Sequence, residues 1–372
     1  MRIHIVKREN CSLLQKCGLY VGAVLIALVL GGVLLLSIGV DPIAYYTEMF
    51  TMGTIGNRIA YKTFMNYLKD FVPLVLTSVA LSLAFKMRFW NIGGEGQFIM
   101  GAIATAWVAI KLGGVLPTAV VLILMCLAAM VAAGLYGLLV AALKVKFGTN
   151  ETLLTLMLNY VALYVLTYLL ETKAAWNFFL EPTALRPVPQ SFDNVVSFPS
   201  IPLGGKFALN ICVILALAVG ALIYVYLKYT KQGYEIAVVG DSAGTARYAG
   251  MKVNRIVLRT VFLSACLVGL AAAFKVGTVG TISTTITNDV GWTGIIVAWL
   301  SQLNTGVIFV VSALICVLHT GSVEAAASFS RVDSSFANML QGVILFLILA
   351  ADFFIRFRVV IVRKGGKTNG NG

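Results

Sequence analysis

Charged residues are scarce in this chain. Only 12% of its 372 residues are Asp, Glu, Lys or Arg, about half of the fraction usual in a soluble domain. Apolar residues make up 59% of the chain, and they gather in runs of about 20 residues, the length that crosses a bilayer as a helix. The composition therefore excludes a soluble globular protein and predicts a polytopic helical membrane protein.

Histidine and paired cysteines are also lacking. The two histidines, His4 and His319, are far apart in the sequence, and the six cysteines are scattered without a CxxC pair. Cysteines placed in this way are typical of small apolar side chains inside helices. A metal site or a disulfide framework is not expected.

Catalytic motifs are missing as well. The sequence contains no HExxH, no GxSxG and no complete Walker A motif, and each of these patterns carries a specific chemistry. We therefore expect no enzyme activity and no cofactor in this chain. If ATP and Mg drive its function, separate ATP-binding subunits use them.

Ten apolar segments can be distinguished, and the first follows a basic amino-terminal stretch that could mimic a secretory signal. That run of about 22 residues is longer than a signal core of 7–15 residues, and no A-x-A-like site follows it, so we expect a retained membrane span. The ten segments are 19–40, 71–88, 96–112, 115–142, 152–171, 207–228, 257–275, 291–303, 306–320 and 337–355.

The distribution of charge predicts the orientation in the membrane. With ten crossings, both ends and the loops near 86–95, 144–151 and 228–259 lie on one side, which holds 19 of the 28 Lys and Arg residues. That side has a net charge of +13 and the other side a net charge of zero. The positive-inside rule makes the basic side, with both termini, cytoplasmic. The membrane topology thereby explains the excess of basic over acidic residues, and no nucleic-acid partner is expected.

Three loops are long. On the outside, 41–70 is amphipathic and 172–206 is rich in proline, and each could either cover helix ends or dock an outside partner. The cytoplasmic loop 229–256 is rich in small residues. It could be a solvated connector, or a short helix in it could pack into a groove of a soluble protein.

The two halves of the chain, 19–171 and 207–355, look related. Segments 71–88 and 257–275 contain the dipeptides Phe85-Lys86 and Phe274-Lys275, and a glycine-rich polar stretch follows each. Five spans per half would give the halves inverted topologies, an arrangement common in transporters. The predicted fold is an all-α transmembrane bundle of about ten segments in two inverted five-helix halves, forming one domain over 1–372.

The first polar stretch, WNIGGEGQ (90–97), interrupts the helix pattern between apolar runs. Backbone N–H and C=O groups freed by such a break survive at membrane depth only where they face protein or a watery cavity. A polar solute could use these groups together with Asn91, Glu95 and Gln97. The alternative is an ordinary cytoplasmic turn, with Glu95 near a helix start.

The second polar stretch contains Asn288, Asp289 and Trp292. An aromatic ring beside amides could be a platform for a sugar ring or a nucleobase, and it could equally belong to an interfacial aromatic belt. Asn159 lies in the middle of segment 152–171. Such an amide either joins helices or contacts solute.

Four stretches together resemble one family, the permease subunits of bacterial ABC importers for ribonucleosides and simple sugars. These are FWNIGGEGQFIMGAIAT (89–105), GTNETLLTLMLNYVALY (148–164), VVGDSAGTARYAGMKVNRIVLRTVFLSACLVGLAAA (238–273) and QGVILFLILA (341–350). The second stretch resembles the nucleoside branch.

The resemblance implies an importer permease in the cell membrane that works with ATP-binding subunits, a second permease subunit and an extracytoplasmic solute-binding protein. It places the 91–97 break along the solute path and a coupling helix for the ATPase within 238–252. The residues expected in that coupling segment are Gly240, Asp241, Ala246, Ala249 and Gly250.

Three alternatives remain open at this point. A simple sugar could replace the nucleoside as solute. An ion-coupled secondary transporter would need an ionisable group inside the membrane, and only Glu95, Asp289 and Asp352 come near that position. A polytopic membrane enzyme would act on a membrane-bound substrate.

Overall fold

The computed structural model describes residues 2–7, 12–55, 60–192, 195–204, 207–329, 331–332 and 334–362. The chain divides into two compact units, residues 59–316 and residues 1–58 together with 317–372. Each unit is described by itself. Helix α12 (Thr305–Ser328) begins in the first of these units and ends in the second.

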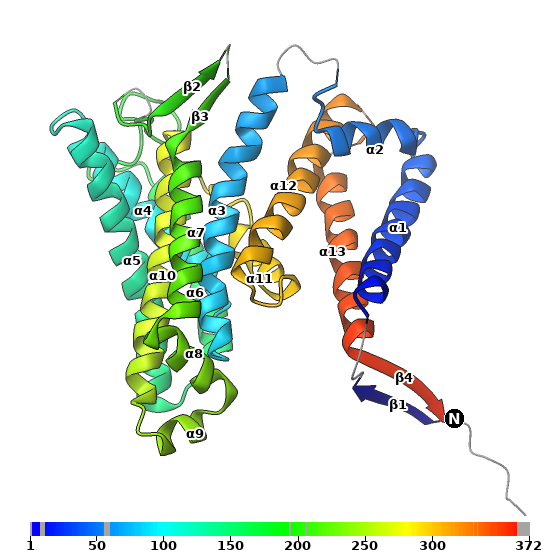
Figure 1. The fold of residues 1–372 in the computed structure, drawn as a ribbon. Coiled ribbons are helices and arrows are strands. Elements are labelled where there is room, and N and C mark those ends of the chain that lie inside the picture. The colour runs from blue at the N-terminus through cyan, green and yellow to red at the C-terminus, as the bar shows by residue number, and fades with distance from the viewer. Residues whose placement is uncertain are drawn as a thin grey trace, which may run out of the picture. The chain divides into compact units, whose positions relative to one another are not determined.

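The unit 59–316 is a bundle of helices with one β-hairpin (Figure 1). The hairpin pairs β2 (Ser200–Gly204) with β3 (Phe207–Asn210), with Ser200 opposite Asn210 and an irregularity at Pro202. Its helices, besides the first part of α12, are α3 (Ala60–Lys86), α4 (Gly94–Leu112), α5 (Thr118–Phe147), α6 (Glu151–Glu171), α7 (Ile211–Tyr229), α8 (Lys231–Asp241), α9 (Ala243–Tyr248), α10 (Val253–Val279) and α11 (Val290–Leu300).

Helices α3 and α10 form the centre of this bundle. In their most apolar stretches 78% and 72% of the residues are buried, against 28% in α5, α6 and α7, so the latter three are the ones that can face lipid. The central pair is antiparallel, because the Ser264 hydroxyl donates to the Ala80 carbonyl at 2.6 Å while Lys275 pairs with Asp70 nearer the other end.

Small residues bring α4, α5 and α10 close together. A Cβ on Gly101 of α4 would lie 2.9 Å from the Cα of Gly269 on α10, and a Cβ on Gly134 of α5 would lie 2.6 Å from the Cys266 sulfur. Close backbone approach at small residues is the usual means of packing helices in a membrane. It gives the broken segments described below a tightly packed support.

Helix α11 is too short to cross a membrane. Its 11 residues extend roughly 16 Å, against a hydrocarbon core of about 30 Å. Gly294 of α11 lies beside Thr77 and Ser78, in the second half of α3, and Gly94 at the start of α4 lies beside Leu81. Both α4 and α11 therefore begin inside the bundle rather than at its ends.

The other unit contains β1 (Arg2–Lys7), α1 (Leu13–Ser37), α2 (Pro42–Thr51), the end of α12, α13 (Ser334–Arg356) and β4 (Phe357–Val362). Its core surrounds the buried ring of Tyr45, which packs on Phe329 and Phe336. Strand β1 pairs antiparallel with β4, with Arg2 opposite Val362 and Lys7 opposite Phe357. The first and the last strand that the structure describes therefore lie side by side.

Each of the ten expected apolar segments overlaps a helix, but the bounds differ, and residues 207–210 of the sixth segment form β3. The segment expected to start at 71 starts at Ala60, because the amphipathic sequence before it continues the helix, and the loop expected at 41–70 contains α2. The described residues are mostly helical, as the prediction of an all-α fold requires, with two short two-stranded sheets in addition. Among the described residues, seven helices are long and apolar enough to cross a membrane.

Candidate functional site

The first break lies between α3 and α4. The Asn91 side chain is buried there, accepting from the backbone N–H of Gly93 at 3.0 Å and from the Gln97 amide at 3.1 Å, while its own amide donates to Gln97 at 3.3 Å. Asn91 and Gln97 thus satisfy each other and one freed backbone group. These two side chains, which belong to the break itself, stabilise its backbone conformation.

A residue of α6 holds the same break from outside. Asn159 accepts from the N–H of Gly96 at 2.8 Å and donates to the carbonyl of Ile92 at 2.9 Å. The Thr155 hydroxyl, one turn earlier, accepts from the N–H of Ile92 at 3.2 Å. A Cβ on Gly96 would lie 2.9 Å from the Asn159 amide oxygen, so this clamp requires the glycine.

The second break lies between α10 and α11 and is held mainly by its own turns. Asn288 and Asp289 both adopt the left-handed conformation, with φ of 46° and 54°, which Asn and Asp tolerate better than most residues. Local bonds of 3.0 to 3.2 Å run from the N–H groups of Ile286, Asn288 and Val290 to carbonyls three residues earlier. These turns allow α11 to begin inside the bundle rather than at its end.

The two breaks meet at Glu95. Its carboxylate accepts from the backbone N–H of Gly291 at 2.8 Å and hydrogen-bonds with the Thr287 hydroxyl. Glu95 lies in the first turn of α4 and Gly291 in the first turn of α11, so the carboxylate faces the positive ends of two helix dipoles. A Cβ on Gly291 would overlap the backbone of Glu95, so the contact also requires glycine.

A cavity of about 270 Å³ opens beside this contact. Of the seven residues that the sequence analysis placed on the solute path, five line it: Glu95, Asn159, Asn288, Asp289 and Trp292. The other two, Asn91 and Gln97, are 0% and 1% exposed and bond to each other behind it. The remaining lining residues are Ile99, Tyr160, Leu163, Thr284, Thr285 and Thr287.

The arrangement suits a small polar solute. The cavity combines two carboxylates, amide and hydroxyl groups with the ring of Trp292, and a few placed polar groups beside an aromatic surface are typical of small-molecule sites. The sequence analysis missed Thr287 and Thr155. Thr287 lies in a threonine-rich stretch and Thr155 in the pattern TNETLLT, but neither pattern indicated which groups these hydroxyls would hydrogen-bond.

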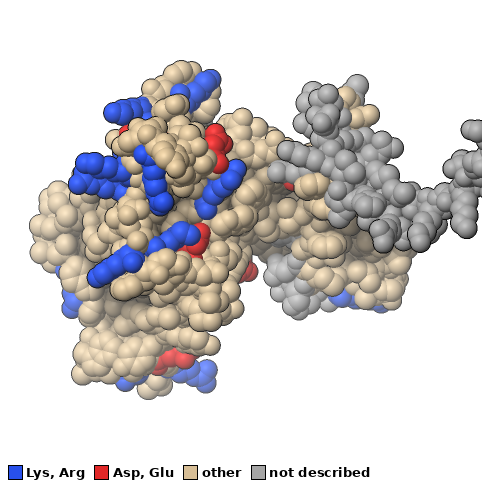
Figure 2. All heavy atoms as spheres, turned by 90° about the horizontal axis from the view of Figure 1, so that it is seen from below, with Lys and Arg blue, Asp and Glu red and all other residues tan. Residues whose placement is uncertain are grey.

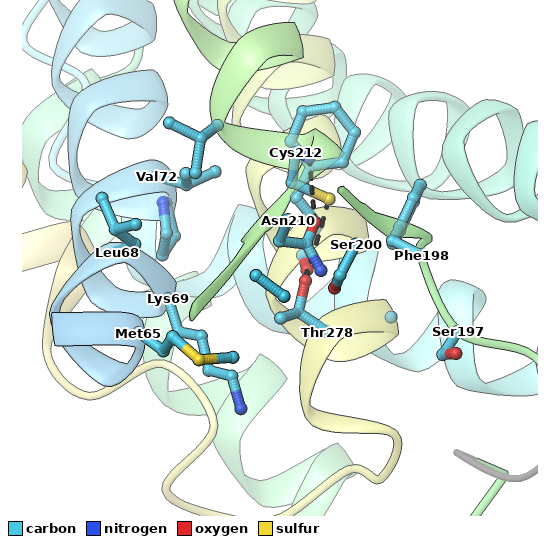
Figure 3. A pocket seen from close by; sticks show the side chains of 15 residues that line it. Met65, Leu68, Lys69, Val72, Ser197, Phe198, Ser200, Asn210, Cys212 and Thr278 are labelled. Carbon is cyan, nitrogen blue, oxygen red and sulfur yellow. Dashed lines mark hydrogen bonds between the residues drawn. The ribbon is translucent and has the colours of Figure 1, made fainter. Parts of the chain in front are cut away.

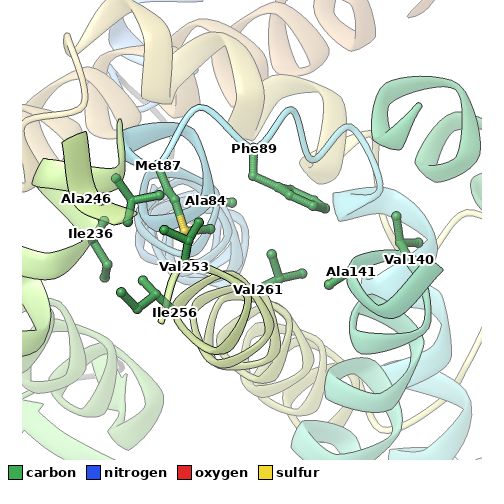
Figure 4. Close-up of a cluster of buried hydrophobic side chains, with 11 residues drawn as sticks. Ala84, Met87, Phe89, Val140, Ala141, Ile236, Ala246, Val253, Ile256 and Val261 are labelled. Carbon is green, nitrogen blue, oxygen red and sulfur yellow. The ribbon is translucent and has the colours of Figure 1, made fainter. Parts of the chain in front are cut away.

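The loop expected to couple to an ATPase folds as α8 and α9 (Figure 4). Two of the five residues predicted there point inward. Ala246 is fully buried in an apolar cluster with Ile236, Met87 and Phe89, and a Cβ on Gly240 would overlap the carbonyl of Lys86. The three others, Asp241, Ala249 and Gly250, are exposed.

The surface around α8 and α9 is basic. Figure 2 shows Lys and Arg gathered on this face of the molecule. Tyr248, at the end of α9, is 96% exposed. The exposed basic residues at the ends of the helices here are Arg88, Lys146, Lys228, Lys231, Arg247, Lys252 and Arg255.

A second cavity, of about 220 Å³, lies near the opposite ends of α3 and α10, beside the β2–β3 hairpin (Figure 3). Asn210 caps α7 there by accepting from the N–H of Cys212 at 2.9 Å, and the Thr278 hydroxyl donates to the Phe274 carbonyl at 2.6 Å. No residue that the sequence analysis placed in a site lines this cavity.

Metal chemistry finds no support in the described part of the chain. No group of three or more His, Cys, Asp or Glu side chains is placed there to hold an ion. The four cysteines Cys126, Cys212, Cys266 and Cys316 are free thiols.

Apolar helices that enclose two touching polar breaks define the class of this protein, a polytopic membrane protein with discontinuous helices of the kind found in transporters. The family model "Branched-chain amino acid transport system / permease component" matches residues 63–349. The chain belongs to this permease family. The resemblance noted from the sequence is thereby confirmed.

Three relatives support the assignment along nearly the whole chain. The glucose ABC transporter permease protein TsgB13 of Haloferax volcanii is 30% identical, covering 92% of this chain and 90% of that protein. The guanosine ABC transporter permease protein NupP of Bacillus subtilis is 26% identical, covering 92% and 96%. The nucleoside ABC transporter permease protein NupB of Lactococcus lactis subsp. cremoris is 27% identical, covering 81% and 82%.

Family membership confirms two broader interpretations. The chain is an ABC-type permease component, which makes it a multi-pass membrane transporter subunit rather than an enzyme. The solute, the arrangement of halves and the orientation of the termini are matters of proposal.

Proposed function

We propose that this chain is the membrane-spanning permease of an ATP-driven importer that moves nucleosides into the cell. Separate cytoplasmic subunits bind ATP and Mg, an extracytoplasmic protein delivers the solute, and a second identical or homologous permease completes the path through the lipid bilayer. The support is membership of the permease family and the two relatives named for guanosine and nucleosides.

The observation that carries the proposal is the contact between Glu95 and Gly291 beside the cavity. Two helices that begin at depth, with polar breaks supported by protein, are the means by which transporters build a polar site inside a membrane. The solute path then passes the five polar and aromatic residues that line the cavity, with Asn91 and Gln97 supporting it.

The antiparallel pair α3 and α10, each followed by a break and a helix that begins at depth, also supports two inverted halves over 19–171 and 207–355. In this arrangement the basic surface around α8 and α9 faces the cytoplasm, where positive loops are retained. Both termini are then cytoplasmic as well. Reporter fusions after residues 10 and 365 should both give the cytoplasmic signal, and opposite signals would contradict this topology.

The exposed part of the loop 229–256, including Asp241, Ala249 and Gly250, is the surface proposed to contact the ATP-binding subunits. Ala246 and Gly240 anchor it to the bundle. A short helix presented on a rigid base suits insertion into a groove of a partner.

A simple sugar is the second candidate solute, favoured by the relative named for glucose. Both solutes present hydroxyls for the cavity's polar groups and a face for Trp292. A nucleobase offers the larger aromatic surface for stacking, because stacking on an aromatic residue contributes about 1–3 kcal/mol per base.

Uptake of labelled guanosine, adenosine, uridine, ribose and glucose tests the proposal in cells that lack this chain, with and without its restoration. Restored nucleoside uptake supports it, restored uptake of a sugar alone moves the chain to the sugar candidate, and no restored uptake contradicts both. Trp292→Ala should lower nucleoside uptake about tenfold or more if stacking is lost. Trp107→Ala, at an exposed tryptophan away from the cavity, is the matched control.

A further inference from the structure

The second break is attached to the proline-rich loop on its own side of the bundle. The N–H of Phe192 donates to the Gly280 carbonyl at 2.9 Å, and the Thr281 hydroxyl donates to the Gln190 carbonyl at 3.4 Å. Close by, the Phe198 ring packs edge-on against Phe274 of α10 with centroids 5.5 Å apart. A movement of the loop 172–199 would therefore reach the start of the second break directly.

The first break is attached to the loop on the opposite side. Met87 and Phe89, in the break, are 4% and 3% exposed and share one apolar cluster with Ile236 of α8 and Ala246 of α9 (Figure 4). A movement of α8 and α9 would therefore reach the break without an intervening flexible segment.

A short series of hydrogen-bonded residues connects each of these two loops to the contact between Glu95 and Gly291. Phe89 accepts from the N–H of Asn91 at 2.9 Å, and Asn91 holds Gly93 and Gln97 on either side of Glu95. On the other side the turns that follow Thr281 lead to Gly291. The two routes meet where Glu95 accepts from Gly291.

We propose that the Glu95–Gly291 contact is the joint through which an outside input and an inside input are coupled. The inference rests on the proposed function, in which the ATP-binding subunits dock on the exposed part of α8 and α9, and it adds that the solute-binding protein docks on the outer loop 172–199. Coupling needs a physically connected element that both partners can bias. Helices α3 and α10 are continuous, whereas each break interrupts the helical pattern and the two breaks touch at this contact.

The test measures ATP hydrolysis by the complex purified through a tag on this chain and placed in liposomes. The quantity is the ratio of hydrolysis with binding protein and guanosine to hydrolysis without them. Gly291→Ala should lower this ratio at least about fivefold, because the added Cβ separates Gly291 from Glu95. Gly294→Ala, one turn further along α11, meets Thr77 at 3.2 Å and should keep the wild-type ratio.

A second pair of variants tests the inner route away from the cavity. Phe89→Ala should also lower the ratio, while Phe346→Ala, at an exposed phenylalanine outside the cluster, should keep it. Wild-type ratios for both Gly291→Ala and Phe89→Ala would overturn the proposal, and so would equal losses in the two controls. A wild-type complex that neither hydrolyses ATP nor responds to guanosine and binding protein would instead overturn the proposed function before any variant is compared.

Discussion

The two breaks do the same structural task by different means. Both start a helix inside the bundle, but the first is held by its own Asn91 and Gln97 together with side chains of α6, and Asn159 lies 63 residues from the Gly96 whose N–H it binds. The second is held by turns of its own backbone and by two residues in the left-handed conformation. The first break therefore depends on the packing of α6, whereas the second carries much of its own geometry.

The difference follows from where unpaired backbone groups can find partners. The glycines of the first break have no side chains, and Asn91 pairs only the N–H of Gly93, so other freed N–H and C=O groups need donors and acceptors from a neighbouring helix. Threonine, asparagine and aspartate favour local turns, so the segment before α11 pairs its groups internally. Substitutions in the two breaks should accordingly differ in size of effect.

Asn159→Leu should have the largest effect. It leaves the Ile92 carbonyl and the Gly96 N–H without partners in a buried site, and each such group costs about 1–3 kcal/mol. Thermal unfolding of the purified permease should show a clear loss of stability. Tyr164→Leu, at an exposed position of the same helix, should leave the unfolding temperature near wild type. Equal stability of both variants would mean that the clamp is not needed.

Glu95→Ala should come next, and its effect should appear in transport. The variant removes the acceptor of the Gly291 N–H, and a hydrogen bond to a charged group contributes about 1.5–3 kcal/mol. Solute uptake should therefore fall about tenfold or more. Glu95→Gln keeps a neutral acceptor and should retain more uptake than Glu95→Ala. Equal losses in the two variants would show that the charge, rather than the contact, matters.

One threonine that contacts the first break and one that lies in the second give the smallest and most direct comparison. Thr155→Val removes the acceptor of the Ile92 N–H and should cost about 1 kcal/mol of stability. Thr285→Val changes an exposed side chain near the second break and should change stability by less than about 0.5 kcal/mol. Chemical unfolding of the two variants side by side measures the difference. A larger loss of stability in Thr285→Val than in Thr155→Val would contradict the conclusion that the first break depends more on side-chain contacts than the second.

The helical segments were accessible from sequence because a run of apolar residues long enough to cross a bilayer must satisfy its backbone internally. Each of the ten expected segments overlaps a helix, although α3 starts eleven residues early and residues 207–210 form a strand. The β1–β4 pair was not accessible, because it joins residues at opposite ends of the chain. Local sequence contains no signal for such a pairing.

The candidate site was partly accessible. Glycines and polar residues between apolar runs marked both breaks, and five of the seven named residues line one cavity. No local pattern separated Asn91 and Gln97, which face each other, from Glu95, which faces the second break. Within the loop 229–256, burial separates Gly240 and Ala246 from Asp241, Ala249 and Gly250, and a short amphipathic stretch does not reveal which face is covered.

By itself the sequence determined that this protein is a helical membrane protein, where its helices lie, and where two of them are interrupted, because these properties depend on hydrophobicity and local backbone preference. Only the tertiary structure decided that the two interruptions touch, at Glu95 and Gly291. That contact joins residues 196 apart in the chain. It depends on the antiparallel packing of α3 and α10 and on the space left by a missing Cβ, neither of which a local pattern encodes.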